Sequence, residues 1–115
     1  MKLAIIGSRE FTDYKKARKI YKNFFEKFTT AIVSGGARGA DLIGKQLAEE
    51  FEVEYIEYPA DWNGPHGKMA GFIRNGQIVD ASDMCLCFWD GASSGTKDSL
   101  DKLKASKKPT FLIYV

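Results

Sequence analysis

The feature that most constrains the fold is a regular alternation of short apolar runs with longer segments of helical periodicity. Five such runs recur along the chain: KLAIIG (2–7), TAIVSG (30–35), VEYIEY (53–58), MCLCFW (84–89) and TFLIYV (110–115). Four are almost continuously apolar, which is typical of strands covered on both faces. VEYIEY alternates more than the others, so we expect this strand at an edge of the sheet.

The segments between the runs carry apolar residues at helical spacing. The pattern predicts helices over about 14–28, 43–51, 68–81 and 96–105, with Thr12 or Asp13 as the N-cap of the first. Strands that alternate with helices predict an α/β fold, in which a five-stranded parallel sheet has helices on both faces. Right-handed crossovers make 3-2-1-4-5 the most economical strand order. At 115 residues, we expect one domain, 1–115.

Composition narrows the function classes. The apolar and charged fractions, 44% and 28%, are those of a soluble globular protein, and no apolar stretch reaches membrane-spanning length. The opening MKLAIIGSR is too short for a signal peptide, so the sequence predicts a cytoplasmic protein without a membrane partner. A net charge of +2 is too weak to argue for nucleic acid.

The two cysteines, Cys85 and Cys87, lie in one apolar run. Two residues apart on a strand, they share a face, and this is a poor geometry for a disulfide. No second Cys/His cluster accompanies them, so we expect reduced core residues, with neither a metal site nor a cofactor.

Unusual residues follow four of the five predicted strands, at the ends where open parallel sheets bind ligands. These candidate ligand-binding residues are Gly7, Ser8 and Arg9 after the first strand; Ser34, Gly35, Gly36, Arg38, Gly39 and Asp41 after the second; Asp61 and Trp62 after the third; and Asp90, Gly91, Ser94, Gly95 and Thr96 after the fourth. The opposite ends carry ordinary turn residues. This asymmetry predicts a site at one edge of the sheet.

The residue types suit an anionic ligand. Glycines let backbone N–H groups approach a phosphate at a helix N-terminus, and Arg38 can add a bidentate clamp. Asp41 suits ribose hydroxyls, and Trp62 could stack on a base. Structural interpretations stay open: a tight strand-to-helix turn for the glycines, a helix-dipole contact for Asp41 and a core-edge cover for Trp62. The glycine-rich segment SGGARG (34–39) is neither a Walker A loop nor a G-x-G-x-x-G motif. His66, the one histidine, fits a loop position.

Four motifs, GSREFTDY, IVSGGARGAD, PADWNGPHGKMAGFIRN and FWDGASSGTKDS, resemble in order and spacing the cpYpsA-related SLOG proteins of the YspA type, within the SMF/DprA–LOG superfamily. The resemblance covers nearly the whole chain. It implies a Rossmann-like three-layer sandwich and a single SLOG-type nucleotide-binding domain. The implied ligand is a nucleotide or a nucleotide-derived molecule such as ADP-ribose.

The LOG branch of that superfamily comprises phosphoribohydrolases with an arginine before a P-G-G-x-G-T-x-x-E segment. Arg74, followed by Asn75, matches the place of that arginine, and Gly91, Gly95 and Thr96 match the segment. Asp90 replaces the proline, and Ser99 stands where the glutamate is expected. If the chain is an enzyme, Arg74 and the adjacent Asp98 are therefore the candidate catalytic residues, with Asp41, Asp61 and Asp90 as alternative carboxylates.

Three functions follow, in order. The first is a nucleotide-ligand binding module that acts as a sensor, carrier or sequestering protein. The second is a LOG-like enzyme that cleaves an N-glycosidic bond. The third, ranked last, is single-stranded DNA binding, implied by the DprA branch; the lysines over 15–22 are largely offset by the glutamates over 49–57. The apolar last run is compatible with a homodimer or larger homo-oligomer.

Overall fold

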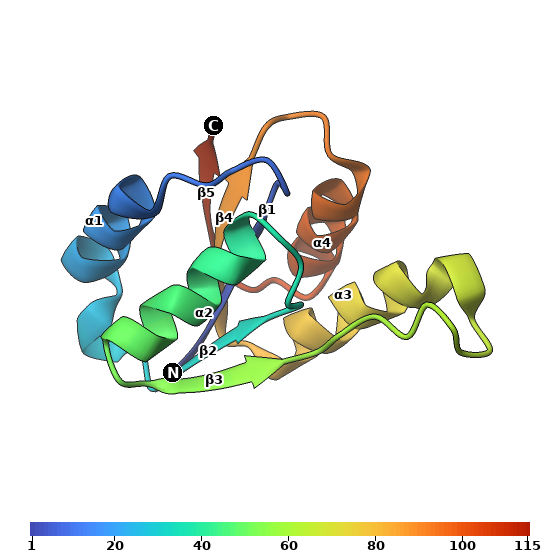
Figure 1. Ribbon diagram of the computed structural model, residues 1–115, viewed down its shortest axis with the longest axis horizontal. Helices are drawn as coiled ribbons and strands as arrows, with labels where there is room; N and C mark the ends of the chain where they lie inside the picture. The colour runs from blue at the N-terminus through green and yellow to red at the C-terminus, as the bar shows by residue number, and fades with distance from the viewer.

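The computed structural model describes residues 1–115 and contains five strands and four α-helices in alternation (Figure 1). The strands are β1 (Lys2–Gly7), β2 (Ala31–Ser34), β3 (Glu54–Glu57), β4 (Met84–Trp89) and β5 (Thr110–Tyr114). The helices are α1 (Tyr14–Phe24), α2 (Ala40–Glu50), α3 (Ala70–Ala81) and α4 (Ser94–Ala105), with short 3-10 turns η1 (Glu26–Phe28) and η2 (Gly67–Met69). Each predicted strand and helix is present.

All strands pair in parallel, in the order β3-β2-β1-β4-β5. This confirms the α/β fold, the Rossmann-like sandwich and the predicted order 3-2-1-4-5. It also confirms the edge position of β3, whose four residues are all at least partly exposed. The other edge is β5, where Phe111 and Tyr114 are exposed and Phe24 of α1 stacks on Phe111.

Alternate residues of β1 point to opposite faces of the sheet and fill two separate cores. Leu3 and Ile5 pack with Tyr21 of α1 and Leu47 of α2. Ala4 and Ile6 belong to the second core, which α3 and α4 cover on the opposite face (Figure 1). Both cysteines are free and buried in this second core, as expected from their shared face. Both faces of the sheet are therefore covered by helices. A ligand can approach the sheet at the ends of its strands.

The helix boundaries differ from the periodicity by a few residues. The first helix ends at Phe24, and η1 carries the chain on to Phe28. Asp13 is the N-cap, and its carboxylate accepts the N–H of Lys16 at 3.2 Å. The fourth helix begins at Ser94, two residues before the predicted start at Thr96. Ser94 and Gly95 are exposed and not apolar, so apolar periodicity does not mark them. No helix is both long and apolar enough to cross a membrane.

Candidate functional site

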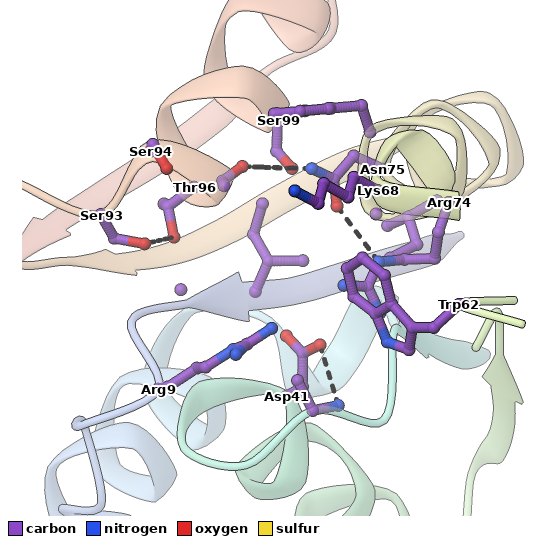
Figure 2. A pocket seen from close by; sticks show the side chains of 17 residues that line it. Arg9, Asp41, Trp62, Lys68, Arg74, Asn75, Ser93, Ser94, Thr96 and Ser99 are labelled. Atoms are coloured by element: carbon purple, nitrogen blue, oxygen red, sulfur yellow. Dashed lines mark hydrogen bonds between the residues drawn. The ribbon is translucent and has the colours of Figure 1, made fainter. Parts of the chain in front are cut away.

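Two cavities lie side by side at the carboxyl edge of the sheet, with volumes of about 430 and 370 Å³. Arg9, Ala37, Trp62 and Arg74 line both, so the cavities are adjacent. We call them together the rim groove. Figure 2 shows the side chains of the larger cavity, which come from the loops after β1 and β2, from the segment between β3 and α3, from α3 itself, and from the start of α4.

The loop after β2 forms one wall and is fixed by Asp41, in the first turn of α2. One carboxylate oxygen, Oδ2, accepts the backbone N–H of Gly35 at 3.1 Å and that of Ala37 at 3.3 Å. The side chain is almost fully buried, and burial raises the pKa of Asp41 to about 6. Nearby Arg74, the two N–H donors and Arg9 offset this effect only in part.

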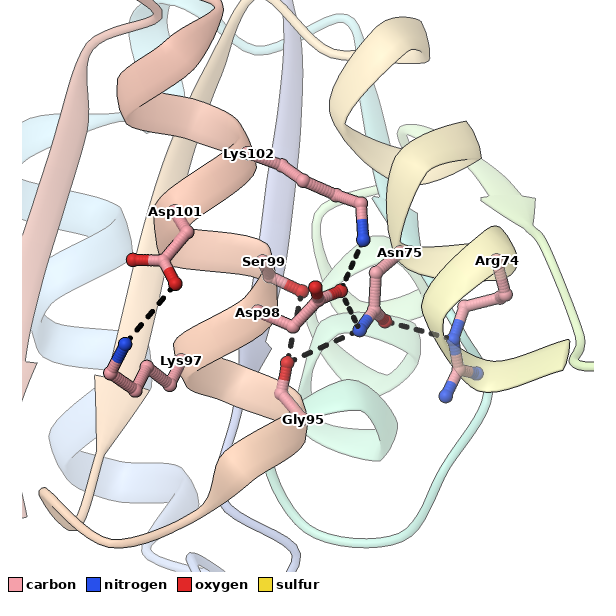
Figure 3. A network of polar contacts seen from close by, with 8 residues as sticks. All are labelled: Arg74, Asn75, Gly95, Lys97, Asp98, Ser99, Asp101 and Lys102. Atoms are coloured by element: carbon pink, nitrogen blue, oxygen red, sulfur yellow. Dashed lines mark hydrogen bonds and ion pairs between the residues drawn. The ribbon is translucent and has the colours of Figure 1, made fainter. Parts of the chain in front are cut away.

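Arg74, on α3, reaches across to the same loop. Its Nη1 donates to the carbonyl oxygen of Gly35 at 3.0 Å, and its Nε donates to Oδ1 of Asn75 at 3.2 Å. The Asn75 amide in turn donates to the Gly95 carbonyl and to the Asp98 carboxylate, which also pairs with Lys102 (Figure 3). This network joins α3 to α4 and holds the Arg74 guanidinium in the groove.

The opposite wall is the N-terminus of α4. Asp90 shapes the turn before it, because its Oδ1 accepts the N–H groups of Ala92 and Ser93, both at 2.8 Å. These bonds stabilise the charged carboxylate and hold the pKa of Asp90 below its ordinary value. The turn brings residues 93–96, with their backbone N–H groups and hydroxyls, into the larger cavity. Such a helix start favours an anion.

Trp62 stands between the two cavities with 52% of its surface exposed. Its indole lies on α3 at Gly71, where an added Cβ would be only 2.8 Å from the indole Cη2. Phe72 and Lys68 line the same cavity. Gly71 thus lets the Cη2 edge of the indole approach α3, while about half of the Trp62 surface stays exposed.

The groove is strongly cationic. Its charged lining consists of Arg9, Arg38, Lys68 and Arg74, with Asp41 as the one acidic residue. Only Arg38 among the four cations has an ion-pair partner, the exposed Glu10, at 2.8 Å. Although the net charge of the chain is only +2, positive charge is concentrated in this groove.

The structure gathers many of the predicted ligand-binding residues at the groove. The lining includes Gly7, Arg9, Gly35, Gly36, Arg38, Asp41, Trp62, Asn75, Ser94, Gly95 and Thr96, together with the candidate catalytic Arg74. Ser8, Ser34, Gly39, Asp61, Asp90, Gly91 and Asp98 do not line it. Ser99, at the place of the LOG glutamate, does face the larger cavity.

The residues outside the lining mostly fix the loops. Ser8 is buried, and its Oγ accepts the N–H of Asp90 at 3.0 Å, which links the ends of β1 and β4. Gly39 has φ +78°, and a Cβ there would lie 2.4 Å from the Arg9 carbonyl oxygen. The Asp98 carboxylate is held by Asn75 and Lys102. These contacts set the shape of the groove without entering it.

Sequence reasoning missed Lys68, Gly71 and Phe72, all of which line the larger cavity. Lys68 and Phe72 flank the start of α3, whose N-terminus lies at the same edge as the other candidate residues. The sequence signal for Lys68 and Phe72 is their position at a helix start, the same signal that marks the candidate residues after the other strands. No cluster of three or more His, Cys, Asp or Glu side chains is placed to hold a metal ion.

The parallel sheet, its strand order and the groove at its carboxyl edge define a Rossmann-like α/β protein. The chain belongs to the YspA, cpYpsA-related SLOG family, whose model matches residues 1–64. It is also 40% identical, over 84 residues, to the Gene 61 protein of Mycobacterium phage D29, a match that covers 68% of this chain and 66% of that protein. The family expected from the four motifs is thus confirmed.

Two solved structures of DNA processing protein A share the fold. The protein from Helicobacter pylori, described for its single-stranded DNA binding mode, has a TM-score of 0.69 and 25% identity over 97% of this chain and 64% of that chain. The protein from Streptococcus pneumoniae has a TM-score of 0.80 and 18% identity over 96% of this chain and 49% of that chain. This chain therefore spans less than two thirds of each of these relatives.

These similarities correct two predictions. The sequence ranked a small nucleotide-derived ligand first and its hydrolysis second, and it set nucleic acid aside as a partner. That ranking is wrong, because the similar solved structures are DNA processing proteins and one is described as binding single-stranded DNA. The error came from judging charge by the sum over the chain, although nucleic-acid binding depends on where the charge lies.

Proposed function

We propose that this protein binds single-stranded DNA along the rim groove. The observation that carries the proposal is the lining itself: four cationic side chains and an exposed indole, with one buried carboxylate as the only acid. A positive groove that follows the backbone, combined with an aromatic platform for the bases, is how proteins bind single strands. The likeness to the Helicobacter pylori protein supports the same partner.

The contacts divide into two kinds. Arg9, Arg38 and Lys68 are free or weakly paired, so they can each neutralise a phosphate. The N–H groups at the start of α4 offer a further anion contact. Trp62 is half exposed and lines both cavities, so its indole is available for a base to stack on. Arg74 is held by Gly35 and Asn75, so it needs little reordering when a strand binds.

Fluorescence anisotropy with a labelled 20-nucleotide strand and with the matching duplex tests the proposal. We expect the single strand to bind at least tenfold more tightly than the duplex. With three or four phosphates neutralised, the slope of log K against log salt should be about −2 to −3. Arg9→Ala and Arg38→Ala should each reduce this slope by about 0.7.

Lys104→Ala is the matched control, because Lys104 is exposed in the last turn of α4, outside the groove. It should leave both the affinity and the salt slope unchanged. Absence of single-strand binding at physiological salt, or equal losses in the control and in the arginine variants, would contradict the proposal. A cytoplasmic location and a homo-oligomer, both expected from the sequence, stay predictions.

A further inference from the structure

The Asp41 carboxylate forms the floor of the rim groove. Its negative charge is unexpected in a groove proposed to bind DNA. Asp41 is the only acidic residue of the lining, and only 7% of it is exposed. Oδ2 is occupied by the N–H groups of Gly35 and Ala37, whereas Oδ1 makes no hydrogen bond to the protein. Figure 2 shows the carboxylate in the cavity between the side chains of Arg9 and Trp62.

This charge decides which part of a nucleotide can occupy the floor. A phosphate placed on Asp41 would meet a like charge at short range, in a site where water screens it little. The phosphates must therefore lie toward Arg38 and Lys68, away from the floor. A neutral base can take the floor, provided that it brings a hydrogen-bond donor for Oδ1, because a desolvated carboxylate oxygen without a donor is costly.

The chemistry beside Asp41 restricts the base further. Nη2 of Arg74 makes no hydrogen bond to the protein, and neither does the guanidinium of Arg9. The floor therefore offers an acceptor, Oδ1, next to arginine donors. Guanine presents the complementary edge, since its N1–H and N2 amino groups both point toward an acceptor and its O6 accepts from arginine.

We propose that Asp41 makes the rim groove select a guanine base in the bound strand; this rests on the proposed single-strand binding. Adenine and cytosine each have one exocyclic amino donor. They therefore offer Oδ1 one donor group, whereas guanine offers two. Thymine has only an imino N–H, flanked by two carbonyl oxygens that a carboxylate repels. The expected order of affinity is therefore guanine first and thymine last.

Competition anisotropy with 12-nucleotide oligothymidylates that differ in one central base tests this selection. A central guanine should bind at least fivefold more tightly than thymine, since a good polar base contact discriminates by about 1–3 kcal/mol. A central inosine, which lacks only the N2 amino group of guanine, should lose a measurable part of that advantage. The inosine comparison uses the wild-type protein, so it holds even if a variant at position 41 folds poorly.

Asp41→Asn should remove the guanine preference, because the amide cannot offer the same charged acceptor, while it leaves the salt slope nearly unchanged. Asp101→Asn is the matched control, since Asp101 is exposed on α4 and pairs with Lys97 outside the groove; it should keep the preference. Equal affinity for all four bases, a preference for adenine or cytosine, or a preference that survives in Asp41→Asn would overturn the inference. No binding of any oligomer would instead overturn the proposed function, and the inference with it.

Discussion

Asp41 and Arg74 both hold the backbone of Gly35. The Asp41 carboxylate accepts the N–H of Gly35 at 3.1 Å, and the Arg74 guanidinium donates to the Gly35 carbonyl at 3.0 Å. The loop after β2 is thereby fixed both to α2 and to α3, which lie on different faces of the sheet (Figure 1). The two charges lie beside Gly35 without forming a direct ion pair. Oδ1 of Asp41 and Nη2 of Arg74 make no hydrogen bond to the protein, and both residues line the groove.

A side chain at position 35 should break this arrangement. A Cβ on Gly35 would lie 2.3 Å from Nη1 of Arg74 and 2.9 Å from Oδ2 of Asp41, so at least one of them must move. We expect Gly35→Ala to weaken single-strand binding by at least tenfold, because the groove loses the position of its anchored arginine. Anisotropy measures the loss, and circular dichroism checks that the fold is kept.

Gly76→Ala is the matched control for this substitution. Gly76 lies inside α3, and the nearest atom to an added Cβ is Cε of Lys102, at 3.8 Å. Alanine is favoured over glycine in a helix interior, so the variant should gain about 0.5–1 kcal/mol in free energy of unfolding. Its DNA affinity should stay unchanged. Similar affinity losses in both glycine variants would contradict the role assigned to Gly35.

Trp62 is expected to be the stacking platform. Trp62→Ala should weaken binding by about 1–3 kcal/mol, the value of one base–aromatic stack, whereas Trp62→Phe should retain much of the affinity. The free energy of unfolding should change little, because half of the side chain is exposed. Tyr114→Ala, which removes an aromatic side chain that is 65% exposed on β5, is the control and should bind normally.

Intrinsic fluorescence gives a second measurement of the same contact. The chain has two tryptophans, and the other, Trp89, is half-buried and donates its indole N–H to the Ser93 carbonyl. DNA should quench the emission of the wild-type protein much more than that of Trp62→Phe. Equal quenching in the two proteins would show that Trp62 does not contact the bases.

Glu10 is expected to compete with DNA for Arg38. The ion pair between them is highly exposed, with side-chain exposures of 82% and 71%, so it contributes little to stability. Glu10→Gln should free the guanidinium and remove a repulsive charge near the groove, which raises DNA affinity by about twofold to fivefold at low salt. The effect should fade at high salt. A loss of affinity would indicate that Glu10 positions Arg38 instead of masking it.

The fold was predictable because its signals are local. Continuous apolar runs identify strands buried on both faces, and 84–89 matches β4 at both ends. The alternating run at 53–58 carries the signal of an edge, and all four residues of β3 are at least partly exposed. Helix starts were less predictable: Ser94 begins α4 through turn contacts from Asp90, and apolar periodicity does not register these contacts.

The location of the candidate site could be predicted from the sequence, but its binding partner could not. Glycines and polar residues at strand ends located the groove, because parallel strands end at one edge. The sequence could not show that Glu10 pairs with Arg38 and does not itself line the cavities, or that Lys68 joins Arg9 and Arg74. This segregation of charge depends on tertiary structure, and it decides what the groove attracts.

Asp41 should also make stability depend on pH in an unusual direction. The pKa of its carboxyl rises from 3.8 to about 6 on folding, so the folded state binds the proton more tightly than the unfolded state. The contribution of Asp41 to stability is therefore most favourable below about pH 4 and declines as the pH rises through 6. The difference between the two pKa values corresponds to about 3 kcal/mol.

Asp41→Asn removes this titration while it leaves an oxygen for the N–H groups of Gly35 and Ala37. Urea denaturation of both proteins between pH 4 and pH 7.5 isolates the effect, because all other carboxylates are common to the two. The wild-type protein should lose about 2.4 kcal/mol relative to the variant over this range, with most of the change below about pH 6.5. A difference that stays constant with pH would show that Asp41 is not titrating near 6. The anionic floor of the groove would then cost the fold nothing at neutral pH.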